Sequence, residues 1–99
     1  MTNVLHLTLK AQWFNLIAHG IKAEEYRAIK PHWNRRFNNR EYDVIQFVNG
    51  YGNHRPKMLV ELKDIVTGLG IIEWGATPGE RCYILRLGRI LEISNYEMQ

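Results

Sequence analysis

The segment from Gly20 to Arg27 carries a dense set of chemically active side chains, since Lys22, Glu24, Glu25 and Arg27 fall within six residues. In an extended strand, side chains two positions apart share a face, so Glu25 and Arg27 are expected to be neighbours. Arg27 could offer a planar fork to a phosphate or a base edge, and Lys22 a compact positive charge. This combination predicts a site for RNA or a nucleotide-like ligand.

Aromatic and basic side chains extend the predicted site beyond this segment. An unpaired base that stacks on an aromatic ring gains about 1 to 3 kcal/mol. Between residues 22 and 40, six basic side chains stand against two acidic ones, and clustered positive charge attracts polyanions. We therefore predict binding of RNA, another single-stranded nucleic acid or a nucleoside. The predicted ligand-binding residues are Lys22, Glu25, Tyr26, Arg27, Trp33, Arg35, Arg36 and Tyr51.

A structural interpretation of the same residues stays open. Glu25 and Arg27 could form an ion pair that closes the fold, and Tyr26 and Trp33 could belong to the core. The turn around Asn49–Gly50 is expected from its composition, because Gly and Asn accept positive backbone angles at little cost.

Metal and cofactor sites are not expected. The four histidines, at positions 6, 19, 32 and 54, lack the spacing of zinc ligands, and the single Cys82 has no partner for a disulfide. Cys82 lies in an apolar run, which is typical of a buried thiol in a reducing compartment. No dinucleotide or Walker fingerprint surrounds Gly50 and Gly52.

The elements that must position these residues follow from periodicity. Alternating apolar residues predict strands, and a broad apolar stripe that ends at Gly20 predicts a helix. The predicted strands cover residues 4–9, 22–29, 42–48, 58–66, a short segment at 71–74, and a strand pair within 82–93 broken at Gly88. The predicted helices cover residues 11–19 and 32–37, the second begun by Pro31.

The composition fits one small domain. Ninety-nine residues with 45% hydrophobic content suffice for one core and are too few for two. No apolar run of about 20 residues and no signal-peptide pattern occurs, so we expect a cytoplasmic protein without membrane contact. Five or six strands with two short helices predict an α+β fold whose sheet rolls toward a barrel, since a short flat sheet would expose its edges.

The sequence resembles short bacterial and phage-borne members of the ASCH family, whose motif Gly-x-Lys-x-x-Glu-x-Arg is matched by Gly20, Lys22, Glu25 and Arg27. The likeness covers nearly the whole chain, including the stretches at 30–33, 49–52, 74–76 and 83–88. It implies a PUA-like β-barrel spanning residues 1–99, with a cleft for RNA or a modified nucleoside between the first helix and the motif strand.

The resemblance also implies candidate activities. Some ASCH proteins are amidohydrolases that deacylate a modified cytidine with the motif Lys, a Thr three residues later and a distant Glu. Lys22 matches here, but Glu25 occupies the Thr position, and a carboxylate does not simply replace a hydroxyl nucleophile. Lys22 could instead orient a water while Glu25 or Glu61 acts as general base. A ribonuclease and a phage-encoded protein-interaction module are the further alternatives.

Overall fold

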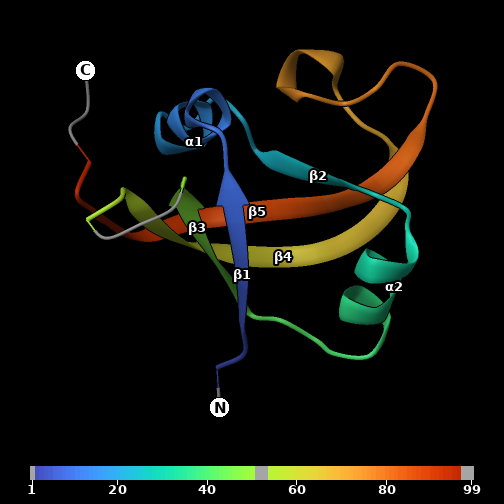
Figure 1. Cartoon of the computed structure of the whole chain (residues 1–99), viewed down its shortest axis with the longest axis horizontal. Coiled ribbons are helices and arrows are strands. Elements are labelled where there is room, and N and C mark those ends of the chain that lie inside the picture. The colour runs from blue at the N-terminus through green and yellow to red at the C-terminus, as the bar shows by residue number, and fades with distance from the viewer. Residues whose placement is uncertain (1, 51–53, 97–99) are drawn as a thin grey trace.

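A five-stranded sheet curls into a half-barrel accompanied by two short helices (Figure 1). The computed structural model describes residues 2–50 and 54–96. The elements in chain order are β1 (Val4–Leu9), α1 (Ala11–Ala18), β2 (Glu24–Ala28), α2 (Pro31–Asn38), β3 (Val44–Asn49), β4 (Lys57–Leu69), the 3-10 turn η1 (Ile72–Trp74) and β5 (Arg81–Ser94). These elements confirm a small α+β domain with a barrel-like sheet.

The sheet order is β1-β3-β4-β5-β2, so β1 and β2 are its two edges. The β1/β3 pair is parallel and the other three pairs are antiparallel. Although β1 and β2 flank α1 in the sequence, no backbone ladder joins them. Something other than strand pairing must therefore hold the two edges of the half-barrel together.

The core lies on the concave face of the sheet. Leu5, Leu7 and Leu9 of β1 are buried, as their alternation predicts, and α1 buries Phe14 and Ile17 against them. Burial of a large apolar side chain of this kind stabilises the folded state by about 1.5 to 3 kcal/mol. The core thus fixes β1, α1 and the central strands as one packed unit.

Backbone-specific residues set the ends of the helices. Gly20 has φ +75°, and the N–H groups of Gly20 and Ile21 bond to carbonyls in the last turn of α1, which is how a left-handed residue terminates a helix. A Cβ at Gly20 would meet nothing within 4 Å, so the backbone angle is what requires glycine there. Pro31 occupies the first turn of α2 after the extended Lys30. Both boundaries agree with the sequence prediction.

Two predicted elements were wrong. The segment 71–74 is a 3-10 turn and not a strand: Trp74 N–H bonds to Ile71 O, and Gly75, at φ +105°, ends the turn. The strand pair predicted within 82–93 is one continuous strand, β5. Gly88 does not break it but permits close approach, because a Cβ there would lie 3.0 Å from Glu61 Cβ, beside the register shifts between β4 and β5.

No helix in the described ranges 2–50 and 54–96 has the length and apolar character to cross a membrane. The longest elements are instead the strands β4 and β5, which pair along most of their length and form the spine of the half-barrel (Figure 1).

Gly70 and Gly68 provide a matched test of packing over the sheet. A Cβ at Gly70 would lie 2.7 Å from the Tyr26 ring and 2.8 Å from Ala76 Cβ, whereas a Cβ at Gly68 would make an ordinary 3.4 Å contact with Ile84. We expect Gly70→Ala to lower the free energy of unfolding by about 1 to 3 kcal/mol, since overpacking forces neighbours to move. Urea denaturation measures this, and equal losses in Gly70→Ala and Gly68→Ala would contradict it.

Candidate functional site

Lys22 lies fully inside the protein, with no side-chain surface exposed. Its ammonium donates to Glu24 O at 2.6 Å and to Trp74 O at 2.8 Å, and lies 3.2 Å from Glu25 Oε1. An ammonium has three protons, so all of them have an acceptor. Burial lowers the pKa of Lys22, while the Glu25 carboxylate opposes that shift.

Glu25 links Lys22 to Arg27. One carboxylate oxygen lies against the Lys22 ammonium, and the other accepts a 2.8 Å hydrogen bond from Arg27 Nη2. Only 8% of the Glu25 side chain is exposed, so the carboxylate lies in a region of low dielectric between two cations. The predicted neighbourhood of Glu25 and Arg27 is confirmed, and Lys22 joins them in one buried row of charges, Lys22–Glu25–Arg27.

Arg27 connects the two edges of the half-barrel. Its Nη2 also donates to Thr8 O of β1 at 3.1 Å, so this side chain spans from β2 to β1. Arg36 of α2 donates to a second backbone carbonyl of β1, His6 O, at 3.3 Å. Unpaired carbonyls on a strand edge invite pairing with another chain, and here guanidinium groups satisfy two of them. The Arg27 and Arg36 side chains thus substitute for a missing strand ladder.

The Trp33 ring packs against both of these arginines and against two further rings of α2. The guanidinium carbons of Arg27 and Arg36 each lie 5.1 Å from the Trp33 ring centroid, which is within cation–π range. Phe37 stacks on Trp33 at 5.3 Å with an interplanar angle of 19°, and the His32 ring meets it edge-on at 4.6 Å. Trp33 is therefore a half-buried packing element of α2 and a support for both arginines.

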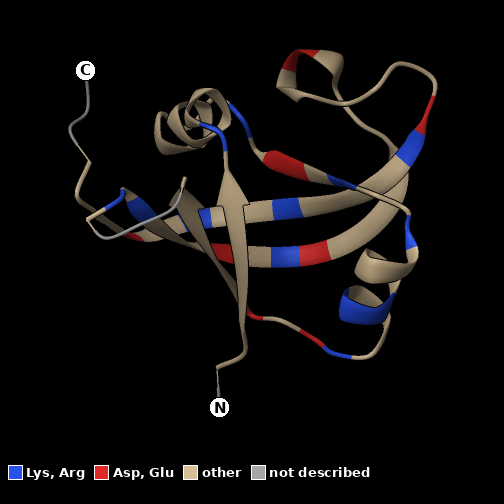
Figure 2. Ribbon diagram, in the orientation of Figure 1, with Lys and Arg blue, Asp and Glu red and all other residues tan. Residues whose placement is uncertain are grey.

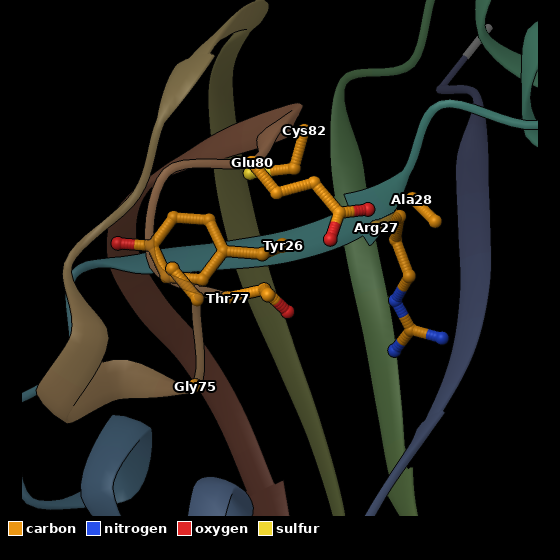
Figure 3. A pocket seen from close by; sticks show the side chains of 8 residues that line it. Tyr26, Arg27, Ala28, Gly75, Thr77, Glu80 and Cys82 are labelled. Carbon is orange, nitrogen blue, oxygen red and sulfur yellow. The ribbon is translucent and has the colours of Figure 1, made fainter.

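Tyr26 points to the opposite face of β2 from Arg27 (Figure 3). Its hydroxyl donates to the Glu24 carboxylate at 2.7 Å and accepts from Ile71 N–H at 2.9 Å, while the Lys22 ammonium lies 4.7 Å from the ring centroid. Burial raises the pKa of Tyr26. Tyr26 and Lys22 together fasten the segment around η1 to the sheet.

A small pocket opens beside the edge of β2. It has a volume of about 120 Å³ and lies between β2 and the loop before β5 (Figure 3). Its lining residues are Tyr26, Arg27, Ala28, Gly75, Ala76, Thr77, Glu80 and Cys82. Arg27 Nε, which borders the row of charges, is buried without a hydrogen-bond partner. The exposed carboxylate of Glu80 in the lining disfavours an anionic ligand at this pocket.

The predicted site residues divide into three groups. Lys22, Glu25, Arg27, Tyr26, Trp33 and Arg36 converge around β2 and α2, where they bind one another. Arg35 lies apart, exposed on the outer face of α2. Tyr51 lies outside the described residues.

The geometry gives no support to a catalytic role for Lys22 and Glu25. The Lys22 ammonium has no free proton position, and both carboxylate oxygens of Glu25 already contact cations of the protein. Glu61, the alternative base, lies elsewhere on β4, where hydrogen bonds from Arg89 lower the pKa of its carboxyl group. Within residues 2–50 and 54–96, no group of His, Cys, Asp and Glu side chains could hold a metal ion. Cys82 is buried, as its apolar surroundings predict.

Several partners of this cluster escape sequence reasoning. The acceptors on Thr8, His6 and Trp74 are backbone carbonyls, which carry no residue-type signal. Asn34 accepts a hydrogen bond from the Tyr83 hydroxyl and so anchors α2 to β5. Its position one residue after Trp33, beside the apolar face of α2, is the only available hint.

No family model, curated protein or solved structure matches the chain. The ASCH resemblance therefore stays a prediction.

Removing the central carboxylate tests the row of charges. We expect Glu25→Gln to lower the free energy of unfolding by about 3 kcal/mol or more, because it leaves the buried Lys22 ammonium without its counter-ion. Urea denaturation followed by circular dichroism measures the change. Glu61→Gln is the control. It removes a solvent-accessible carboxylate that pairs with Arg89 on the same sheet, and it should leave the urea midpoint nearly unchanged. Equal midpoints for both variants would show that the row contributes no stability.

The raised pKa of Tyr26 predicts a loss of stability in alkali. Above pH about 10 an unfolded tyrosine loses its proton, whereas folded Tyr26 retains it, so stability falls as the pH rises through that value. The lowered pKa of Lys22 has the opposite sign and acts below about pH 10.4. Urea midpoints between pH 8 and 11 should therefore fall less steeply at the alkaline end in Tyr26→Phe. An unchanged slope would contradict the assignment.

Proposed function

We propose that this domain is a small PUA-like barrel of the ASCH type that binds RNA through the basic surface of α2. The observation that carries the proposal is the charge of one segment. From Tyr26 to Arg40 every ionised side chain is basic, with five Lys or Arg residues and no Asp or Glu. Figure 2 shows basic residues at the end of β2, on α2 and in the loops at the two ends of α2.

Contacts within the domain divide the basic side chains of this segment into two groups. Arg27 and Arg36 donate hydrogen bonds to carbonyls of β1. In contrast, the side chains of Lys30, Arg35 and Arg40 are exposed. Within the described chain, no carboxylate lies within ion-pair distance of these three side chains. We call Lys30, Arg35 and Arg40 the α2 basic surface. Its charges are available to a ligand without breaking an internal contact.

The helical period explains the arrangement. Trp33 and Phe37 are four positions apart and face the core, and Arg35 lies about 200° around the helix from Trp33. The apolar face thus holds α2 on the sheet while Arg35 projects to solvent. Phosphate neutralisation by such side chains releases counter-ions, which makes binding depend strongly on salt.

The test is the salt dependence of RNA binding in matched variants. We expect Lys30→Gln/Arg35→Gln/Arg40→Gln to bind a single-stranded or structured RNA at least about 10-fold more weakly than the parent, and to have a shallower slope of log affinity against log salt. Fluorescence anisotropy between about 50 and 200 mM salt measures both. Since all three side chains are exposed, urea midpoints should be unchanged.

Lys57→Gln serves as the control. It removes an exposed cation at the start of β4, and this end of the strand lies far from α2 (Figure 1). Its affinity should stay within about twofold of the parent protein. Affinity that is undetectable, or that is independent of salt and of the triple substitution, would remove RNA binding through α2.

A further inference from the structure

Trp33, the ring of α2 that was predicted to stack on a base, already packs against other groups of the protein. Trp33 lies within about 5 Å of Phe37, His32 and the guanidinium carbons of both Arg27 and Arg36. A base that stacked on Trp33 would have to displace one of these groups. Displacing either arginine would also free a carbonyl on the edge of β1. Stacking on Trp33 therefore costs contacts that close the half-barrel.

Tyr26 is equally unavailable. Its hydroxyl makes two hydrogen bonds, the Lys22 ammonium lies against its ring, and Gly70 packs so closely that an added Cβ would overlap the ring. Recognition of single-stranded RNA depends on stacking of splayed bases on aromatic side chains, in addition to positive charge. Of the rings predicted to stack, the two that the structure describes do not offer a free platform.

The available groups have a different character. Lys30, Arg35 and Arg40 are exposed cations on and around a helix about 12 Å long, which is eight residues at 1.5 Å each. Double-helical RNA presents phosphates and 2′-hydroxyls across a wide, shallow minor groove and is recognised largely by shape and by these backbone groups. Exposed cations beside a Trp33 ring that the fold already uses match that ligand.

We infer that the α2 basic surface binds the sugar–phosphate backbone of double-helical RNA, without reading its base sequence. The inference depends on the proposed function, since it names the form of RNA that the same surface binds. It departs from the sequence-based expectation, in which Tyr26 and Trp33 stack on unpaired bases.

The experiment compares one RNA duplex of about 16 base pairs with each of its strands alone, by anisotropy at fixed salt. We expect the duplex to bind at least about 10-fold more tightly than either strand, and a second duplex of unrelated sequence to bind within about twofold of the first. Arg35→Gln should weaken both duplexes equally and lower the salt slope by about one.

The aromatic residues supply the decisive variants. Trp33→Phe retains a ring for packing, and its affinity for the duplex should stay within about twofold of the parent. Tyr51, which lies outside the described residues, is the remaining predicted ring, and Tyr51→Ala should likewise bind the duplex with unchanged affinity.

Two results would overturn the inference, and they differ in what they leave standing. Tighter binding of single strands, with a preference for certain bases that Tyr51→Ala or Trp33→Phe abolishes, would refute backbone recognition of duplexes and leave RNA binding in place. Failure of the duplex and both strands to bind at low salt would remove the proposed function together with the inference.

Discussion

The buried row Lys22–Glu25–Arg27 is the interaction on which the half-barrel depends. The sheet ends in two unpaired edges, and the row reaches from the segment around η1 through β2 to β1. Charges in such a place are expensive to desolvate, and their attraction offsets that cost only where the remaining polar atoms are bonded as well. Lys22 and Glu25 meet this condition. The backbone carbonyls of Glu24 and Trp74 complete the surroundings of Lys22, and the Thr8 carbonyl accepts a hydrogen bond from Arg27.

This use of the charges separates two roles that the sequence places in one segment. A cation that already donates to a carboxylate and to carbonyls in the protein has little left for a ligand, whereas an exposed cation on a helix has all of its donors available. The segment Gly20–Arg27 thus forms the frame of the half-barrel, and α2 carries the surface on which the proposed function depends. Trp33 connects them, since its ring packs against Arg27 on one element and Arg36 on the other.

Local rules predicted much of this fold, and long-range contacts account for the rest. The alternation of Leu5, Leu7 and Leu9, the helix end at Gly20 and the helix start at Pro31 follow from properties of a few adjacent residues. Period two also placed Glu25 beside Arg27. The burial of Lys22 could not be predicted in this way, because its acceptor on Trp74 lies 52 positions away and is a backbone carbonyl. The strand break predicted at Gly88 was wrong for a similar reason, because the glycine allows the close approach of Glu61 on the neighbouring strand.

The spacing Gly-x-Lys-x-x-Glu-x-Arg has a sufficient architectural cause here. Gly20 turns the chain out of α1, Lys22 fastens η1, and Glu25 and Arg27, on one face of β2, carry the charge across to β1. Gly20 is required by its backbone angle, and Lys22, Glu25 and Arg27 each make contacts within the domain that need no ligand. A protein that shares this motif can therefore be expected to share the closure of the half-barrel, while its ligand must be inferred from the side chains that the closure leaves exposed.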